Sequence, residues 1–447
     1  MRDSIDFGKA DIGKLFSSLF FPTLLGMLFS MAFIFTDGIF VGHGIGPDGL
    51  AAINLIGPIM MLINGLGIMF GTGVSVVAAI HLSHGNLKAA RINVTQVFLA
   101  GMTVSLLMGL FCYLFPDIVL GLLGAKGTLY GPAREYYMWF IPTCLLMMIE
   151  NIGLFVIRLD GSPRYAMLAN MIPAVVNIVL DYLFIFPCGW GLMGASLATD
   201  IGGLVAVIMV VYYMVFQAKQ LRLYRLKWTR KSLRLMARNV GYMMRMGASG
   251  LVGELAVSVM MLTGNLMFMR HLGTEGVSAY SVACYLFPLI YMMYIAVSSS
   301  AQPIISFNHG AQADGRVHKT MALSICLSLV MGVVITAFFV FLAPTIVHIF
   351  LEGDTGAGRL AAEGLPYYAA GIIFMGLNIT MVGYYQSIER PGLAVLLTAL
   401  RGIIFLVAAF LLLPRLIGPL GLWLAIPVAE ALTTLVVIAL QLLHGKN

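Results

Sequence analysis

The sequence predicts an all-α integral membrane protein with twelve transmembrane helices, arranged as two parallel six-helix repeats (lobes) around a central cavity. Of its 447 residues, 60% are hydrophobic and 10% are charged, whereas an ordinary soluble domain is about 25% charged. Apolar stretches of about 20 residues, the length that crosses a bilayer, recur along the whole chain. The two halves also share sequence landmarks. These observations exclude a water-soluble fold.

Polar residues, glycines and prolines separate the apolar stretches and so predict the individual helices. The tail before the first stretch lacks the basic start and the small-residue cleavage site of a signal peptide, so we expect that stretch to be retained as a helix. The helices are expected near residues 15–41, 52–80, 92–117, 134–157, 165–187, 192–217, 247–270, 278–307, 320–343, 364–388, 392–413 and 419–443.

The basic residues predict the orientation of these helices. Twenty of the 26 Lys and Arg residues lie in the tails and loops on one side, five lie on the other, and Arg401 lies within a helix. Because positive loops stay in the cytoplasm, we expect a multi-pass protein of the cytoplasmic (inner) membrane with both termini cytoplasmic. The loop over 218–246 holds nine of these bases. We interpret it as a basic amphipathic linker on an anionic leaflet, not as a nucleic-acid site.

The two halves resemble each other at an offset of about 228 residues. Residues 84–91 correspond to residues 309–316, and Pro163 corresponds to Pro391. Six helices in each half give the repeats one orientation, an arrangement typical of transporters that move two bundles about a central cavity. The sequence thus predicts an N-terminal lobe, a basic cytoplasmic linker and a C-terminal lobe at residues 1–217, 218–246 and 247–447.

The sequence contains no motif typical of an enzyme or of a structural metal site. Its five cysteines lie singly within apolar segments, with no CxxC pair and no histidine at metal-ligand spacing. It has no HExxH motif and no recognisable pairing of a nucleophile with a base. We therefore expect no disulfide, no catalytic residue and no cofactor.

Four polar residues predict a cation site in the N-terminal lobe. Asn177 and Asp181 are four residues apart and share one face of the fifth predicted helix. Asp37 and Thr199 lie at a similar depth in the first and sixth. Carboxylate, amide and hydroxyl oxygens suit a small hard cation, and two close carboxylates in a low-dielectric interior repel until a proton or a metal ion joins them. Na⁺ or H⁺ would fit; alternatively, each acid only bonds to a neighbouring helix.

The C-terminal half lacks the counterparts of this site. The repeat partner of Asp37 is Asn265, and that of Thr199 is Ile426. Neither partner carries a carboxylate. The cation site is therefore predicted only once.

Five further charged residues in the predicted helices are candidates to line a substrate cavity, because a charge in hydrocarbon costs at least about 2.5 kcal/mol. They are Glu150, Asp200, Glu254, Arg401 and Glu430. Arg401 and Glu430 lie near the middle of neighbouring helices, where we prefer a structural ion pair. Snorkelling from a helix end explains Glu254 equally well. Glu150 and Asp200 either line the cavity or bond to a neighbouring helix.

Pro22 is a candidate hinge in the first predicted helix, fifteen residues before Asp37. Proline removes one backbone hydrogen bond and permits a kink. A kink there would couple cation occupancy to the shape of the helix. A static bend is the alternative.

Over nearly its whole length the sequence resembles the multidrug and toxic compound extrusion (MATE) family of cation antiporters, and most of all its bacterial multidrug branch. Residues 36–42 are similar to the family's first helix, residues 177–181 to its fifth, and residues 194–199 to its sixth. The resemblance implies that the four side chains named above hold the coupling cation, together with the backbone carbonyl of Ala195.

The sequence departs from the family in the C-terminal lobe. Some members carry an acid pair on the seventh and tenth helices. Here Met375 stands near the tenth-helix position, and Glu254 falls about three residues early for the seventh. This departure argues against a second cation site.

The resemblance implies a Na⁺- or H⁺-coupled antiporter that exports amphipathic, often cationic organic compounds or drugs by alternating access. We also expect a monomer that contacts membrane lipids and small organic substrates. The alternative is a flippase for a lipid-linked or amphipathic metabolite. A groove lined with arginines would favour the flippase, but Arg401 is the one arginine deep in a predicted helix.

Overall fold

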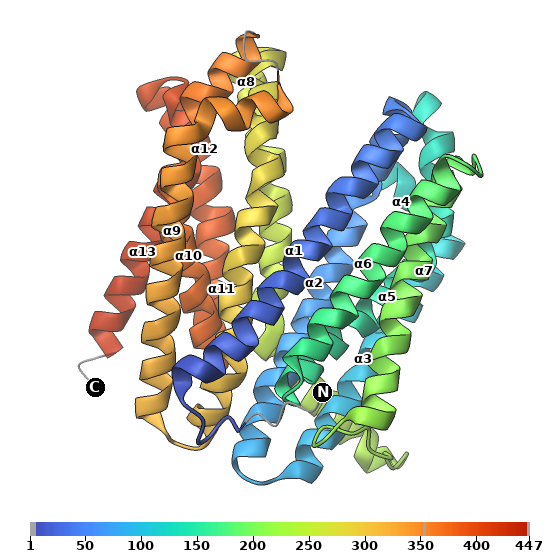
Figure 1. Cartoon of the computed structure of the whole chain (residues 1–447), viewed down its shortest axis with the longest axis vertical. Helices are drawn as coiled ribbons and strands as arrows, with labels where there is room; N and C mark the ends of the chain where they lie inside the picture. The colour runs from blue at the N-terminus through green and yellow to red at the C-terminus, as the bar shows by residue number, and fades with distance from the viewer. Residues whose placement is uncertain (1–5, 352–354, 445–447) are drawn as a thin grey trace. The chain divides into compact units, whose positions relative to one another are not determined.

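The computed structural model describes residues 6–351 and 355–444, and this part of the chain is helical with no β-strand (Figure 1). Eleven helical runs within it are long and apolar enough to cross a membrane. One of them, α8 (Arg230–Gly310), is 81 residues long and is interrupted at Gly273, whose φ of 65° and ψ of −155° are not helical. Glycine adopts a positive φ without a steric penalty. α8 therefore contains two spans, and the prediction of twelve is confirmed.

The chain divides into two compact units. Unit 1 comprises Met1–Leu251 and Ser306–Ala313, and unit 2 comprises Val252–Ile305 and Asp314–Asn447. α8 begins in unit 1, makes its two spans mainly in unit 2 and ends in unit 1. Each unit contains six spans in its described residues, as the internal repeat predicts.

Unit 1 contains six spanning helices and several short helical segments. The spans are α1 (Ile12–Gly44), α2 (Pro47–Ser83), α3 (Leu87–Leu114), α5 (Tyr130–Leu159), α6 (Pro163–Ile185) and α7 (Gly191–Tyr212). The short segments are α4 (Pro116–Leu123), the 3-10 turn η1 (Gly127–Leu129) and the π-helical turn η2 (Tyr213–Gln217), which continues α7. Hydropathy does not predict α4 as a separate helix. Pro116 starts it at a position where the missing N–H costs nothing.

In unit 2, α8 supplies the first two spans. The remaining elements are α9 (Asp314–Phe350), α10 (Gly356–Ser387), α11 (Pro391–Ala399), the π-helical turn η3 (Leu400–Ile404), α12 (Phe405–Ile417) and α13 (Leu420–His444). α11, η3 and α12 together form one span. The register change at η3 lies within the membrane-spanning segment, and single π turns of this kind are frequent at functional sites.

Residues shared by the two repeats start corresponding helices. Pro163 is the first residue of α6, and Pro391 is the first residue of α11. Proline is favoured there because its fixed φ suits a helix and its missing N–H has no helical partner to lose. Asn86 caps α3 by accepting a hydrogen bond from the N–H of Ala89 at 3.1 Å.

Two glycines let the start of α8 pack directly against α2 within unit 1. A β-carbon at Gly247 would lie 1.8 Å from the carbonyl oxygen of Met69, and one at Gly73 would lie 2.0 Å from that of Met243. No side chain fits at such distances, so the two backbones are in contact. Small residues commonly permit this approach between membrane helices.

The predicted linker, residues 218–246, has two structural parts. Residues from Arg230 onward form the first turns of α8, whereas residues 218–229 contain no helix. The buried carboxylate of Asp160, next to the end of α5, accepts hydrogen bonds at 2.8 Å from the backbone N–H groups of Lys219, Gln220 and Leu221. These bonds fix the start of the linker to unit 1.

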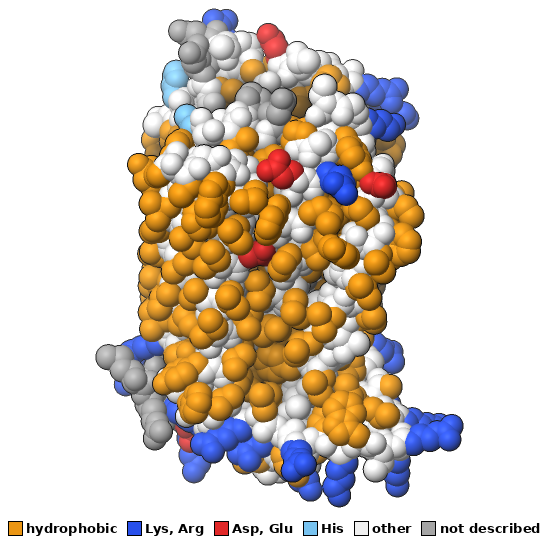
Figure 2. Space-filling view, turned by 90° about the vertical axis from the view of Figure 1, so that its right-hand side faces the viewer, with side chains coloured by type: hydrophobic (Ala, Val, Ile, Leu, Met, Phe, Trp, Pro, Cys, Tyr) orange, Lys and Arg blue, Asp and Glu red, His pale blue; other side chains and the backbone are white. Residues whose placement is uncertain are grey.

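A broad apolar belt covers the face of the molecule shown in Figure 2, and Lys and Arg side chains gather below it. Many large apolar side chains of the described spans are well exposed; Leu107 on α3, for example, is 62% exposed. An exposed apolar surface this extensive marks contact with a membrane. The chain is therefore a multi-pass membrane protein.

Candidate functional site

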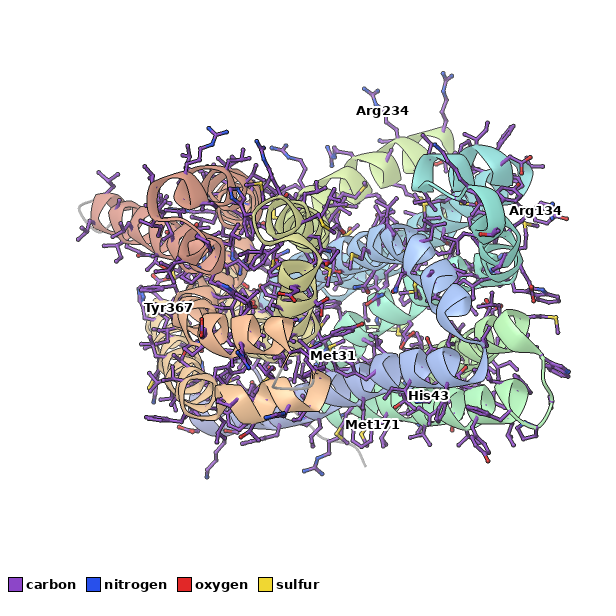
Figure 3. All side chains as sticks on the ribbon, turned by 90° about the horizontal axis from the view of Figure 1, so that it is seen from above. Met31, His43, Arg134, Met171, Arg234 and Tyr367 are labelled. Atoms are coloured by element: carbon purple, nitrogen blue, oxygen red, sulfur yellow. The ribbon has the colours of Figure 1, made fainter. Side chains whose placement is uncertain are left out.

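The predicted cation site lies in unit 1, where α6 packs against both α1 and α7. Figure 3 shows α1, which carries His43 near its end, running beside α6, which carries Met171. These three helices supply the four predicted side chains. They are Asp37 on α1, Asn177 and Asp181 on α6, and Thr199 on α7.

Asn177 and Thr199 connect α6 to α7. The amide nitrogen of Asn177 donates to the Thr199 hydroxyl at 3.3 Å, and this hydroxyl donates to the backbone carbonyl of Ala195 at 3.2 Å. Asn177 is buried, and its Oδ1 has no hydrogen-bond partner among the described residues. The hydrogen bonds therefore leave the Asn177 carbonyl oxygen available as a ligand.

Asp37 and Asp181 lie close enough to interact directly. Asp181 is fully buried, and neither of its carboxylate oxygens has a hydrogen-bond partner within residues 6–351 and 355–444. The same holds for Oδ1 of Asp37. Burying an ionised carboxylate without a partner costs several kcal/mol. Ionising both carboxylates without a partner would therefore be strongly unfavourable at this position.

The chemistry of these side chains fits a small hard cation. Their ligand atoms are carboxylate, amide and hydroxyl oxygens, which Na⁺ and similar ions prefer to nitrogen or sulfur. No group of three or more His, Cys, Asp and Glu residues capable of holding a metal ion occurs in the described part of the chain. A proton would fit equally well, shared between two carboxylates that cannot both ionise without mutual repulsion.

Two neighbouring side chains of α5 are absent from the predicted site. Tyr136 is buried and interacts electrostatically with Asp37, Asp181 and Asp200. Thr143 donates a 2.5 Å hydrogen bond to Asp200 of α7. Asp200 thus bonds to a neighbouring helix, one of its two predicted roles. In the sequence, Tyr136 and Thr143 sit in an apolar run that gives no sign of the helix they face.

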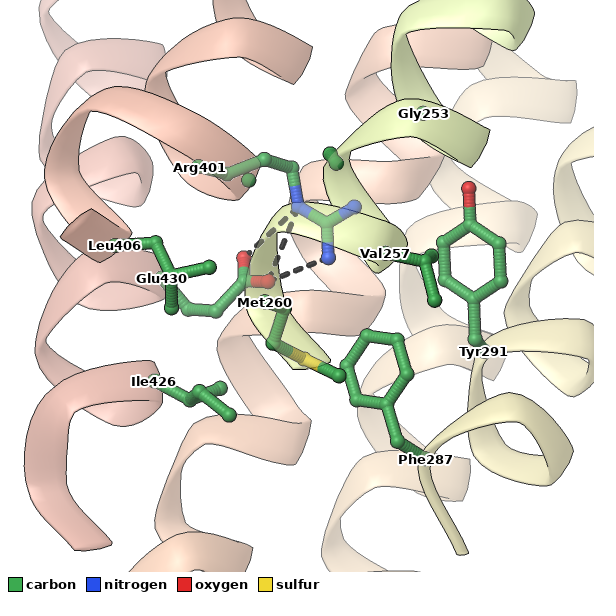
Figure 4. Close-up of a pocket in the computed structure, with 11 residues that line it drawn as sticks. Gly253, Val257, Met260, Phe287, Tyr291, Arg401, Leu406, Ile426 and Glu430 are labelled. Carbon is green, nitrogen blue, oxygen red and sulfur yellow. Dashed lines mark hydrogen bonds and ion pairs between the residues drawn. The ribbon is translucent and has the colours of Figure 1, made fainter. Parts of the chain in front are cut away.

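In unit 2, Arg401 and Glu430 form the predicted ion pair (Figure 4). The guanidinium donates to both oxygens of Glu430 through Nε, at 3.1 Å each, and to one of them also through Nη2. Asn378 of α10 donates to the Glu430 carboxylate at 2.7 Å, and Thr434 donates to Asn378 at 3.1 Å. Arg401 and Glu430 are buried. Their charges therefore neutralise each other within unit 2.

A small pocket adjoins this ion pair. Met260, Phe287 and Tyr291 line it together with both charged residues (Figure 4). Its volume of about 20 Å³ is room for about one water molecule. In this conformation, the ion pair is not accessible to an organic substrate.

The remaining candidates are dispersed over both units. Glu150 is half-buried on α5, and Glu254 is buried on the unit 2 part of α8. Pro22 lies inside α1, which is helical from Ile12 to Gly44. Their roles in a substrate cavity or a hinge stay predictions.

Twelve apolar spans in two repeats, with buried carboxylates in both, define a multi-pass membrane transporter. The chain belongs to the MatE family, whose profile matches residues 22–183 and 251–411, one segment in each repeat. This match confirms the family resemblance; its first segment includes residues 36–42 and 177–181, whereas residues 194–199 lie outside both matched segments. Members of the family are transporters rather than enzymes.

Relatives and solved structures of this family cover nearly the whole chain. An FAD transporter of Shewanella oneidensis is 24% identical over 444 residues, covering 97% of this chain and 95% of its own. The multidrug export protein MepA of Staphylococcus aureus is 21% identical over 432 residues, covering 96% and 93%. The structure of a MOP superfamily transporter from Pyrococcus furiosus matches with a TM-score of 0.88 at 20% identity, over 96% of this chain and 95% of that one. The structural match confirms the fold.

Proposed function

We propose that this protein is a cation-coupled antiporter that exports amphipathic, often cationic organic compounds across the cytoplasmic membrane. The observation that carries the proposal is the set of buried oxygens in unit 1 that lack hydrogen-bond partners. They belong to Asp37, Asn177 and Asp181. The similarity to a multidrug export protein supports the same class of cargo.

The coupling cation is Na⁺ or H⁺, and it enters the site down its gradient. Asp37 and Asp181 neutralise it, and Asn177, Thr199 and the Ala195 carbonyl complete its oxygen shell. Because Asp37 lies on α1 and Asp181 on α6, cation binding changes the repulsion between the two helices. Pro22 lies in the same helix as Asp37 and permits α1 to change shape in response.

The distribution of charges supports one orientation in the membrane. The clustering of Lys and Arg in the tails and in the loops on one side favours cytoplasmic termini. The carboxylate pair then lies in the outer leaflet half of its helices. This is the side of the membrane from which the coupling ion is imported in the proposed exchange.

Efflux from proteoliposomes under separately imposed Na⁺ and H⁺ gradients tests the proposal. At least one gradient should accelerate export of a fluorescent organic cation, and both Asp37→Asn and Asp181→Asn should remove that acceleration. Asp117→Asn is the matched control, since it makes the same change at an exposed carboxylate that bonds to Tyr130. Coupling through this site would be contradicted if neither gradient accelerated efflux. It would also be contradicted if Asp37→Asn and Asp181→Asn both left efflux unchanged.

A second candidate cargo is a flavin or another phosphate-bearing metabolite, because one relative is an FAD transporter. Such a cargo needs cationic partners, and the buried guanidinium of Arg401 is already neutralised by Glu430. The same proteoliposomes loaded with FAD, or with a fluorescent lipid, distinguish the cargo classes. Export of FAD, or lipid flipping, in preference to the organic cation would support the alternative.

A further inference from the structure

A groove opens on the surface of unit 1 between α3, α5 and α7, away from the carboxylate pair. Its walls are apolar and include Leu106, Leu110 and Leu204. Each of these leucines is about half exposed, so the groove faces the surroundings of the unit, not its core. Its volume is about 630 Å³, which falls within the range of small-molecule sites.

One charged side chain lies in this apolar groove. Asp200 of α7 lines it and is 9% exposed. Its Oδ1 accepts the hydrogen bond from Thr143, and no Lys, Arg or His of the described residues forms an ion pair with it. A lipid acyl chain would fill the groove, but it has neither a positive charge nor a hydrogen-bond donor to interact with the carboxylate. A buried carboxylate without a cation calls for a positively charged partner.

The position of Asp200 along α7 narrows the identity of that partner. Asp200 follows the first residue of α7, Gly191, by nine positions, which corresponds to about 14 Å along the helix axis. The helical run Gly191–Gln217 is long enough to cross the membrane, so Asp200 lies below the level of the phospholipid head groups, whose ammonium groups stay at the interface. A lipophilic organic cation that dissolves in the bilayer reaches this depth.

Asp200 and the predicted cation site face different neighbours, although Asp200 follows Thr199 in the sequence. Successive residues of a helix point about 100° apart. The hydroxyl of Thr199 bonds to Asn177 on α6, whereas Asp200 bonds to Thr143 on α5. The groove is therefore a separate site on the same unit.

We propose that this groove binds lipophilic organic cations from the bilayer, with the cationic head at Asp200 and the apolar body along α3 and α7. Binding needs no ion gradient and no second conformation. Binding at this groove can therefore be tested independently of the coupled export proposed above. It assigns a membrane-facing reception site to a part of the chain that the carboxylate pair does not use.

Photolabelling of the full chain in phosphatidylcholine nanodiscs tests this site. The probe is an alkyl trimethylammonium that bears a benzophenone, and its control is the tert-butyl isostere, which has the same shape without the charge. We expect the cationic probe to label α3 and α7 peptides around residues 106–113 and 197–204. Asp200→Asn should reduce this labelling at least tenfold, and Asp117→Asn should not.

A second variant tests the groove itself without touching the charge. Leu106→Trp places bulk among the lining residues and should also reduce the labelling. If Asp200→Asn fails to fold, labelling of Leu106→Trp still tests whether the probe binds in the groove. Equal labelling by both probes, labelling spread evenly over the apolar belt, or labelling that survives Leu106→Trp would overturn the proposal. Asp200 would then serve only to join α7 to α5.

Discussion

Unit 1 and unit 2 bury acidic side chains in opposite ways. In unit 1, Asp37 and Asp181 lie close together, and both Asp181 oxygens and Oδ1 of Asp37 lack hydrogen-bond partners among the described residues. In unit 2, Glu430 is bonded by Arg401 and Asn378. The first arrangement forms no ion pair with a Lys or Arg of the described residues, whereas the second contains the Arg401 guanidinium. This difference supports the proposal that the first repeat exchanges a cation while the second keeps its charges fixed.

The repeat positions show how the difference arises. The hydroxyl of Thr199 accepts a hydrogen bond from Asn177 in unit 1. The corresponding residue in unit 2 is Ile426, which lines the small pocket beside the ion pair. Asp37 corresponds to Asn265. The two repeats therefore share landmarks along the backbone but differ in the polar side chains that they bury.

The largest stability effect is expected from breaking the ion pair of unit 2. Glu430→Gln leaves the Arg401 guanidinium buried without a counter-charge, which should destabilise the protein by about 3–5 kcal/mol. Thermal unfolding in lipid nanodiscs measures this loss. The double variant Arg401→Met/Glu430→Gln removes both charges and should recover more than half of it. A cost below about 1 kcal/mol for the single variant would show that the pair is not structural.

The carboxylates of unit 1 should respond in the reverse sense. Asp181→Asn removes a buried charge that has no partner, so the thermal midpoint should stay the same or rise. Coupled efflux should fall by a factor on the order of ten or more, because the cation loses a charged ligand. Parallel unfolding and efflux assays separate the two outcomes. A variant that loses stability in step with transport would indicate a structural role for Asp181.

A smaller effect is expected from the neutral ligands. Thr199→Val removes one hydroxyl and the bond from Asn177, a change worth about 1 kcal/mol. The cation concentration for half-maximal efflux should therefore rise several-fold, while the maximal rate stays similar. Thr433→Val is a control, since the Thr433 hydroxyl bonds only to the backbone of its own helix in unit 2. Equal effects of the two variants would remove Thr199 from the site.

Hydropathy predicts helix bounds well where a helix is apolar to its ends and poorly where basic residues or a proline interrupt the pattern. Hydropathy predicts α1 as 15–41, close to the observed Ile12–Gly44. The start of α8 at Arg230, against an expected 247, is hidden because its first turns are rich in bases. Pro116 divides α3 from α4 within one apolar run.

The candidate site was predictable from the sequence at positions where a charged residue lies within an apolar segment. Asp37, Asp181 and Glu430 stand out because an acid in an apolar segment needs an explanation. Thr143, Asn378 and Tyr136 do not, since their importance comes from partners on other helices. Asp160 lies in a predicted loop, where an acid needs no explanation. Its hydrogen bonds to the linker become visible only when the structure places the end of α5 beside residues 219–221.

Binding of ²²Na⁺ to the purified protein, measured at alkaline pH and repeated at acid pH, tests the central claim most directly. The account predicts binding that Asp37→Asn and Asp181→Asn abolish and that Arg401→Met/Glu430→Gln preserves. Acid pH should weaken binding, because protons occupy the same carboxylates. If protons are the coupling ion, the same two variants should instead remove proton uptake on acidification. Cation or proton binding that survives both unit 1 variants, or that depends on the unit 2 pair, would contradict it.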